Sequence, residues 1–143
     1  MKIIIGSDHG GFELKEKVVK FLDELGYEYH DVGTYSQESC DYNESALKVA
    51  HGVASQEYDR GITLCGTGIG TSIQANKVKG IRCALVHDLF TAKATREHND
   101  SNVLTLGGRI IGDELAKAIV EVWLKTEFSN EARHKRRIGK IEQ

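Results

Sequence analysis

Cys65 stands at the head of a glycine-rich segment, residues 62–76, that reads ITLCGTGIGTSIQAN. A short apolar run precedes this cysteine, and Gly66, Gly68 and Gly70 follow it at every second position. Glycines at this spacing let a backbone turn tightly and bring its N–H groups close to a ligand. A helix beginning after them would add free N–H groups and a positive dipole end, which favours a thiolate at Cys65. The segment predicts a pocket for negative charge with a sulfur base or nucleophile at its edge.

Two common glycine-rich loops fit this segment poorly. The dinucleotide fingerprint G-x-G-x-x-G would need a glycine where the chain has Thr71. The phosphate loop of NTPases needs Gly-Lys-Ser/Thr, and the first lysine after the glycines is Lys77. A plain strand-to-helix turn around an inert, buried cysteine stays open as an alternative.

A second candidate segment, GSDHGG, covers residues 6–11 and follows an apolar run at 2–5. If that run is a strand of a parallel sheet, Asp8 and His9 lie at the edge where such sheets bind ligands. The flanking glycines favour close approach of a ligand. The alternative is a helix cap at Asp8 beside a surface histidine.

His98 lies in the segment REHND at 96–100, directly before an apolar run at 102–106. An imidazole titrates near neutrality and could serve as a general acid or base. Ordinary capping of a helix C-terminus is the alternative. The segment precedes its strand, so it lies at the opposite edge of the sheet from Cys65. A catalytic His98 would therefore serve a neighbouring subunit.

The last stretch, residues 129–143, is rich in basic side chains. Arg133 and Arg137 are four residues apart and share one helix face, with His134 beside them. Paired guanidinium groups suit a phosphate dianion, while a solvated basic tail or a weak nucleic-acid patch is the alternative. The remaining histidines have no metal-ligand spacing, so we expect no metal site. Cys40 and Cys83 are interpreted as structural or surface thiols.

Composition limits the class of protein. The chain has 143 residues with 40% hydrophobic and 28% charged residues, as expected for one globular domain over 1–143. The net charge of −2 argues against a general nucleic-acid binder. No apolar run approaches the roughly 18 residues of a membrane span, and the N-terminus does not resemble a signal peptide. Three cysteines, an odd number without metal spacing, indicate a reducing cytoplasm.

The elements that must position these groups alternate between strand and helix. Periodicity predicts strands at 2–5, 27–32, 61–64, 81–86 and 102–106. Helices are predicted at 12–25, 41–54, 69–78, 88–97 and 113–127, with Gly26 as a stop, Asp88 as a cap, and a capping box from Asp41 and Glu44. Five β–α units in series predict a parallel sheet covered on both faces, with ligands at the carboxyl ends of its strands.

Several short motifs occur in order over nearly the whole chain. They are GSDHGG, Asp41-Tyr42, CGTGIG, Ala75-Asn76-Lys77, Gly80-Ile81-Arg82, REHND, Asn102-Val103-Leu104, Gly107 and Arg133-His134. In this combination the chain resembles the ribose-5-phosphate isomerase B family. The resemblance implies a Rossmann-like three-layer α/β sandwich with a five-stranded parallel sheet, and a helical tail that packs on the partner of a homodimer or tetramer. It also implies interconversion of ribose 5-phosphate and ribulose 5-phosphate without metal or cofactor.

The resemblance also implies a role for each site residue. Cys65 would be the base that moves a proton between C1 and C2, and Thr67 would move one between O1 and O2. His98 would open the furanose ring with help from Asp8. The amides of Gly66, Gly68 and Gly70, with Ser72 nearby, would stabilise a cis-enediolate. The phosphate would be held by His9, Arg109, Arg133 and Arg137, and the sugar hydroxyls by Tyr42 and Asn99. His98, Asn99 and the tail arginines would come from the partner chain.

Other functions remain open at this point. The chain departs from the family pattern at Asn43, where the family has proline, and at Glu131-Ala132, where it has two glycines. A relative acting on a hexose 6-phosphate, allose or galactose 6-phosphate, is one alternative. A non-catalytic phosphate- or nucleotide-binding regulatory module is another and would not need Cys65. A thiol redox protein fits less well, because no second cysteine lies within a few residues of Cys65.

Overall fold

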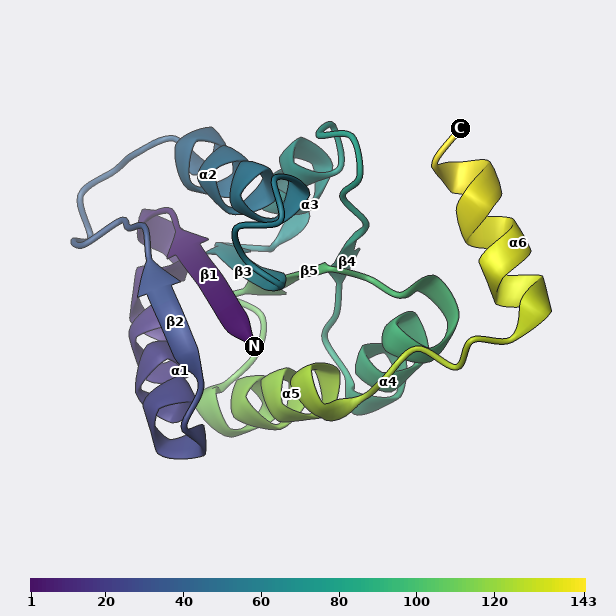
Figure 1. Cartoon of the computed structure of the whole chain (residues 1–143). Coiled ribbons are helices and arrows are strands. Elements are labelled where there is room, and N and C mark those ends of the chain that lie inside the picture. The colour runs from purple at the N-terminus through teal and green to yellow at the C-terminus, as the bar shows by residue number, and fades with distance from the viewer.

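The computed structural model describes all of residues 1–143. Its sheet contains five parallel strands in the order β2-β1-β3-β5-β4 (Figure 1). The strands are β1 Lys2–Ser7, β2 Glu28–Asp31, β3 Arg60–Cys65, β4 Cys83–Leu85 and β5 Val103–Gly107. A short 3-10 helix, η1 His9–Gly11, precedes the helices α1 Phe12–Leu25, α2 Tyr42–Ala54, α3 Ile69–Ala75, α4 Leu89–Asn99, α5 Asp113–Lys125 and α6 Ala132–Ile141.

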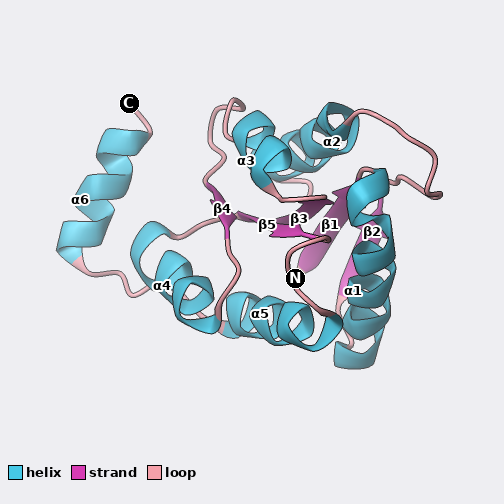
Figure 2. Cartoon of the chain, turned by 180° about the vertical axis from the view of Figure 1, so that it is seen from behind, coloured by secondary structure: helices cyan, strands magenta, loops and turns pink.

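Helices cover both faces of the sheet, and this confirms the predicted three-layer α/β architecture. Helices α2 and α3 pack on one face, while α1, α4 and α5 pack on the other (Figures 1 and 2). Helix α6 stands beyond α4, away from the sheet, in both views. No helix combines the length and the apolar character that a membrane crossing requires.

The central strands are buried on both faces, as parallel sheets require. Successive side chains of a strand point to opposite faces, so β1 contributes to two separate cores. Ile3 and Ile5 join a cluster with Trp123 of α5, whereas Ile4 joins a second cluster with Val49 of α2. Burial of each such side chain contributes about 1.5–3 kcal/mol and holds the strands that carry the site.

Several helix boundaries follow the sequence signals. Helix α1 ends at the left-handed Gly26 (φ +80°), and the carboxylate of Asp88 caps α4 by accepting from Thr91 N at 2.7 Å. The predicted capping box of α2 does not form. Asp41 occupies the N-cap position without a side-chain bond to the helix, and only its carbonyl accepts from Glu44 N, at 3.4 Å.

Other boundaries differ from the prediction because of contacts between distant residues. Helix α3 ends at Ala75 rather than at residue 78, since Asn76 leaves the helix to bond both backbone groups of Cys83. The strand predicted at 81–86 shortens to β4, because Arg82 N donates to the Asn102 side chain rather than to a neighbouring strand. In α5, Leu115 is 38% exposed although it lies four residues before the buried Ile119, on the same side of the helix.

Candidate active site

The strand order brings two of the predicted segments together. Strand β1 lies between β2 and β3 in the sheet. The connection after β1 leads to β2 on one side, and the connection after β2 leads back across to β3 on the other side, so the carboxyl ends of β1 and β3 form a switch point. Asp8 N donates to Leu64 O at 3.1 Å across this point. A Cβ on Gly10 would lie 2.9 Å from Gly66 N, so the two loops meet at a distance that only glycine permits.

Cys65 ends β3 beneath the glycine loop and is only 5% exposed. Its sulfur accepts hydrogen bonds from Gly68 N at 3.1 Å and from Thr71 Oγ1 at 3.4 Å. Two donors directed at one sulfur stabilise a thiolate more than a thiol, because charge strengthens a hydrogen bond. The thiol is therefore held in one position and supplied with donors.

The glycine loop has N–H groups available for a ligand. The amide of Gly68 is used by the Cys65 sulfur and that of Ile69 by Thr67 Oγ1. The amides of Gly66, Thr67 and Gly70 have no hydrogen-bond acceptor within the chain. Gly66 and Gly70 are partly buried, and such amides are almost always paired, so these two indicate an acceptor that comes from outside, with the exposed amide of Thr67 between them. Because α3 has only seven residues, the loop amides rather than a long helix dipole supply most of the positive field.

Two side chains lie against the glycines of this loop. A Cβ on Gly70 would lie 2.6 Å from the ring of Tyr42, and one on Gly66 would lie 3.1 Å from the guanidinium of Arg109. Arg109 is also fixed through its backbone, because its N–H donates to Gly66 O at 2.9 Å. The structure thus brings Tyr42, Arg109 and Thr67 to the loop that follows Cys65. Ser72 instead lies near the Cys83 thiol, whose pKa burial raises to about 12.

The side chains after β1 have defined partners. Asp8 is buried, and its Oδ1 accepts from Gly11 N at 3.1 Å, which caps the short helix η1. His9 Nδ1 accepts from Cys40 N at 3.2 Å and so carries no proton. The other ring nitrogen, Nε2, is then the one that can donate to an anion. Asp8 therefore caps η1, and His9 can donate a hydrogen bond from Nε2.

The remaining predicted residues lie at the other end of the sheet. Cys65 pairs with Gly107, the last residue of β5, whereas His98 and Asn99 end α4 just before β5 begins. Four residue steps of strand, about 13 Å at roughly 3.3 Å each, separate the two levels. His98, Asn99, Arg133 and Arg137 are all exposed, and no contact within the chain links them to Cys65.

His98 is held by the tail helix. The rings of His98 and His134 stack at 4.5 Å between centroids, and His134 is buried with its Nε2 unpaired. Burial, helped by the charges of His98 and Arg133, lowers the pKa of His134 and favours its neutral form. Arg133 forms an ion pair with Glu131 at 3.1 Å, so one departure from the family pattern lies directly on the predicted phosphate clamp.

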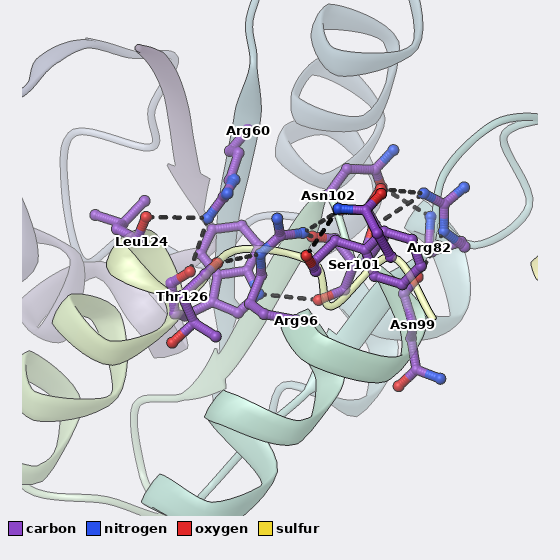
Figure 3. Close-up of polar contacts among 12 residues, drawn as sticks. Arg60, Arg82, Arg96, Asn99, Ser101, Asn102, Leu124 and Thr126 are labelled. Carbon is purple, nitrogen blue, oxygen red and sulfur yellow. Dashed lines mark hydrogen bonds and ion pairs between the residues drawn. The ribbon is translucent and has the colours of Figure 1, made fainter. Parts of the chain in front are cut away.

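Two arginines fix the end of α4 and a third fixes the end of α5, and the sequence pattern does not predict this support (Figure 3). Arg82 donates to Asn99 O and to Asp100 O, each at 2.9 Å, and pairs with Glu142 of the tail at 2.6 Å. Arg96 donates to Ser101 O at 2.6 Å and to Thr126 O at 3.1 Å. Figure 3 also shows Arg60 bonded to the end of α5, and burial lowers the pKa of this guanidinium to about 10.

A well-defined hollow lies away from Cys65. It has a volume of about 810 Å³ and lies between the tail and the segment 76–84 that leads into β4, with Asn99 and Arg82 in its wall. The hollow therefore borders the His98 end of the molecule, and the tail helix forms one of its sides.

Comparison with known proteins identifies the family of this chain. The sequence profile of the ribose/galactose isomerase family matches residues 3–141. The chain belongs to this family. Ribose-5-phosphate isomerase B of Escherichia coli (strain K12) is 47% identical over 140 residues, which are 98% of this chain and 93% of that protein. D-erythrulose-4-phosphate isomerase of Pectobacterium atrosepticum is 41% identical over 133 residues, 90% of this chain and 85% of that protein.

The fold agrees with a solved structure. The chain superposes on ribose-5-phosphate isomerase B of Clostridium thermocellum with a TM-score of 0.97 and 54% identity, covering 99% of this chain and 95% of that one. The family and the fold that the sequence motifs predict are both confirmed. The assignment of individual site residues stays a prediction.

Proposed function

We propose that this chain interconverts D-ribose 5-phosphate and D-ribulose 5-phosphate, an aldose–ketose isomerisation of the non-oxidative pentose phosphate pathway. The observation that carries the proposal is the Cys65 sulfur set beneath unpaired loop amides at the switch point of the sheet. Family membership, with relatives named ribose-5-phosphate isomerase B at 47% and 54% identity, supports this substrate.

The chemistry follows from this pairing of a base with amide donors. The Cys65 thiolate takes the proton from C2 of the open-chain aldose, and the electron pair forms the C1=C2 bond of a cis-enediolate. The charge that develops on O1 lies against the amides of Gly66, Thr67 and Gly70. The Thr67 hydroxyl moves a proton between the two oxygens, and the Cys65 thiol returns its proton to C1. One such amide donor contributes about 2.7–4 kcal/mol in comparable sites.

The other residues bind and prepare the sugar phosphate. Asp8 and His98 act on the ring oxygen and the anomeric hydroxyl as the furanose opens. The phosphate lies among His9, Arg109, Arg133 and Arg137, where guanidinium groups and an imidazole N–H give charge-assisted hydrogen bonds. Tyr42 and Asn99 take the sugar hydroxyls. Gly68 and Ser72 keep the loop in shape, because Gly68 N donates to the Cys65 sulfur and Ser72 N donates to Gly68 O.

A second copy of the chain completes the site in this proposal. His98 and the tail arginines lie at the opposite end of the sheet from Cys65, so one chain does not bring both to one sugar. Apolar side chains gather on α3, β4 and the start of α4, and stay exposed in the single chain: Ile69, Ile73, Leu85, Leu89 and Phe90, the last 79% exposed. A homodimer, or a tetramer of such dimers, would cover them and would use the hollow beside the tail.

A kinetic screen of substrates tests the proposal. Ketose formation is followed with ribose 5-phosphate, allose 6-phosphate, galactose 6-phosphate and a tetrose 4-phosphate, because one relative is named for D-erythrulose 4-phosphate. We expect the highest kcat/KM for ribose 5-phosphate. A higher value for a hexose or tetrose phosphate would reassign the substrate. Tight phosphate binding without turnover of any of the four would instead favour the regulatory module.

The proposal includes no metal and no cofactor. The loop amides are neutral donors that can stabilise an enediolate without a cation. Activity is therefore expected to stay complete after exhaustive treatment with EDTA and gel filtration, measured with ribose 5-phosphate. Loss of activity that a divalent ion restores would refute this point.

We also place the enzyme in the cytoplasm. All three cysteines are free thiols, and Cys65 must stay reduced to act as a base. A reducing compartment meets that requirement.

A further inference from the structure

We propose that Thr71 and Thr105 form a hydroxyl pair that serves Cys65 in both of its protonation states, by reversing the direction of their hydrogen bonds. The inference rests on the proposed function, in which Cys65 alternates between thiolate and thiol in every turnover. It adds two positioning residues that touch the sulfur or each other and never the sugar.

The two hydroxyls come from different elements and are sealed from solvent. Thr71 lies in the first turn of α3 and Thr105 in the middle of β5, and both are fully buried. Their Oγ1 atoms are 2.6 Å apart, and Thr71 Oγ1 is 3.4 Å from the Cys65 sulfur. Each Oγ1 also lies 3.2 Å from Gly68 O.

Each hydroxyl has a single proton, so the contacts cannot all exist at once. With Cys65 as thiolate, Thr105 donates to Thr71, and Thr71 donates to the sulfur. Gly68 O is not left without a donor, because Ser72 N donates to it at 3.1 Å. With Cys65 as thiol, the S–H donates to Thr71, Thr71 donates to Thr105, and Thr105 donates to Gly68 O. Both arrangements use the same heavy atoms and the same two hydroxyl protons, and the thiol state adds the proton on sulfur.

The reversal matters because the two hydroxyls and the sulfur are buried and the sulfur changes charge. A buried hydroxyl or sulfur without a partner costs free energy in whichever state leaves it unpaired. Rotation of two hydroxyl groups removes that cost from both states without moving a heavy atom and without water. The thiolate gains more from its donor than the thiol, because charge strengthens a hydrogen bond, while the thiol still keeps a partner. This suits an isomerase whose base must both lose and regain its proton.

No other side chain performs this task for Cys65. Ionisable groups follow the strands on each side of β3: Asp8 and His9 after β1, Arg109 after β5, and His87 after β4. None of them hydrogen-bonds to the sulfur, and His87 accepts instead from Gly107 N at 3.2 Å. The Thr71 hydroxyl is therefore the only side-chain donor to Sγ.

The test measures the reactivity of Cys65 itself. The rate of alkylation by iodoacetamide is determined against pH, with peptide mass spectrometry to separate Cys65 from the other two cysteines. Thr71→Val keeps the shape and removes the hydroxyl, and we expect the midpoint of the Cys65 profile to rise by about one pH unit or more. Thr71→Ser should restore the midpoint. Thr105→Val should give a smaller rise, because Thr71 can still donate to the sulfur.

The chain offers a matched control. Thr63 lies two residues before Cys65 on the same strand, is fully buried, and has a hydroxyl without a partner. Thr63→Val should leave the alkylation profile unchanged. Thermal unfolding of each variant shows that it is folded, and Thr71→Ala provides a second removal of the hydroxyl if the valine does not fit.

The outcomes separate this inference from the proposed function. An unmoved midpoint in folded Thr71→Val would overturn the hydroxyl pair, even if turnover fell. A rise of equal size in Thr63→Val would also overturn it, because the effect would not depend on the contact with sulfur. A raised midpoint that serine restores supports the pair, even in a chain that fails to isomerise ribose 5-phosphate. In that case the proposed function fails and the pair stands.

Discussion

The Cys65 side chain should account for much of kcat, beyond what the loop amides supply. Cys65→Ala removes the base but leaves the loop amides, so we expect kcat to fall by about 10²- to 10⁴-fold, the range of a general base. Substrate binding should stay measurable, because the thiolate acts on the barrier more than on the ground state. Steady-state kinetics with ribose 5-phosphate measures both quantities, and near-normal turnover would refute the assignment. In the unaltered enzyme, saturating ribose 5-phosphate should slow inactivation by iodoacetamide.

The tail arginines should act on affinity. Arg137→Ala should mainly raise KM, because the phosphate is held equally in the substrate and the transition state.

Glu131→Gln should change KM in the opposite direction. It releases Arg133 from its exposed ion pair, which is worth about 0.2–1 kcal/mol, so KM should fall by up to about fivefold. If KM stays constant in both variants, the tail is only a solvated surface.

At the residue scale, the sequence predicts which residues do the chemistry better than it predicts the contacts that hold them. Glycine spacing and the position of Cys65 predict a loop with free amides, and the structure has that loop. Thr71 reads in the sequence only as the residue that breaks a dinucleotide fingerprint. Its bond to sulfur depends on Thr105, which lies 34 residues away and meets it only across the fold. Likewise, nothing in the sequence indicates that His134 would be buried against His98.

At the scale of elements, local signals place the helices, and long-range bonds decide where some of them end. Helix α1 matches its predicted range, because periodicity and Gly26 agree. Helix α3 ends early, because Asn76 bonds Cys83 of the neighbouring strand β4, and the local pattern predicts that strand but not this contact. The hydrogen bonds of the three arginines in Figure 3 also depend on the whole fold. Each arginine donates to a carbonyl at or just after the C-terminal end of α4 or α5, where the helix has no N–H group left to pair with it.

Docking of α6 on α4 should depend on pH. The lowered pKa of His134 means that the docked ring stays neutral at pH values where a free tail takes up a proton, below about 6.5. Docking is therefore fully favourable above that pH, and weakens as the pH falls toward the lowered pKa. Hydrogen exchange of the α6 amides, corrected for intrinsic rates, should show protection lost at pH 5 and kept at pH 7.5.

His134→Phe is the matched variant for this measurement. Phenylalanine keeps an aromatic ring against His98 and has no titrating group. We expect its α6 protection to change much less between the two pH values. The same acid-dependent loss in both proteins would assign the effect to another group, and would contradict the role of His134.

At the scale of the whole molecule, the proposed sharing of the site predicts complementation. Inactive Cys65→Ala and His98→Ala proteins are mixed, dissociated and reassociated. About half of the dimers are then mixed, and each mixed dimer has one intact and one doubly altered site. Activity should return to about a quarter of the unaltered level on that symmetry argument. A mixture that stays inactive, with subunit exchange shown by mass spectrometry, would refute the shared site.

The separation of Cys65 and His98 by the length of β5 has a consequence for how the enzyme would respond to its own concentration. In the proposed dimer, a newly synthesised chain is folded but silent until it meets another. Activity per chain then falls on dilution and returns on concentration, as a second-order process. A substrate that bridges two chains binds the pair better than the single chain, so by linkage it also holds the pair together. The sugar phosphate would thus help to assemble the catalyst that consumes it.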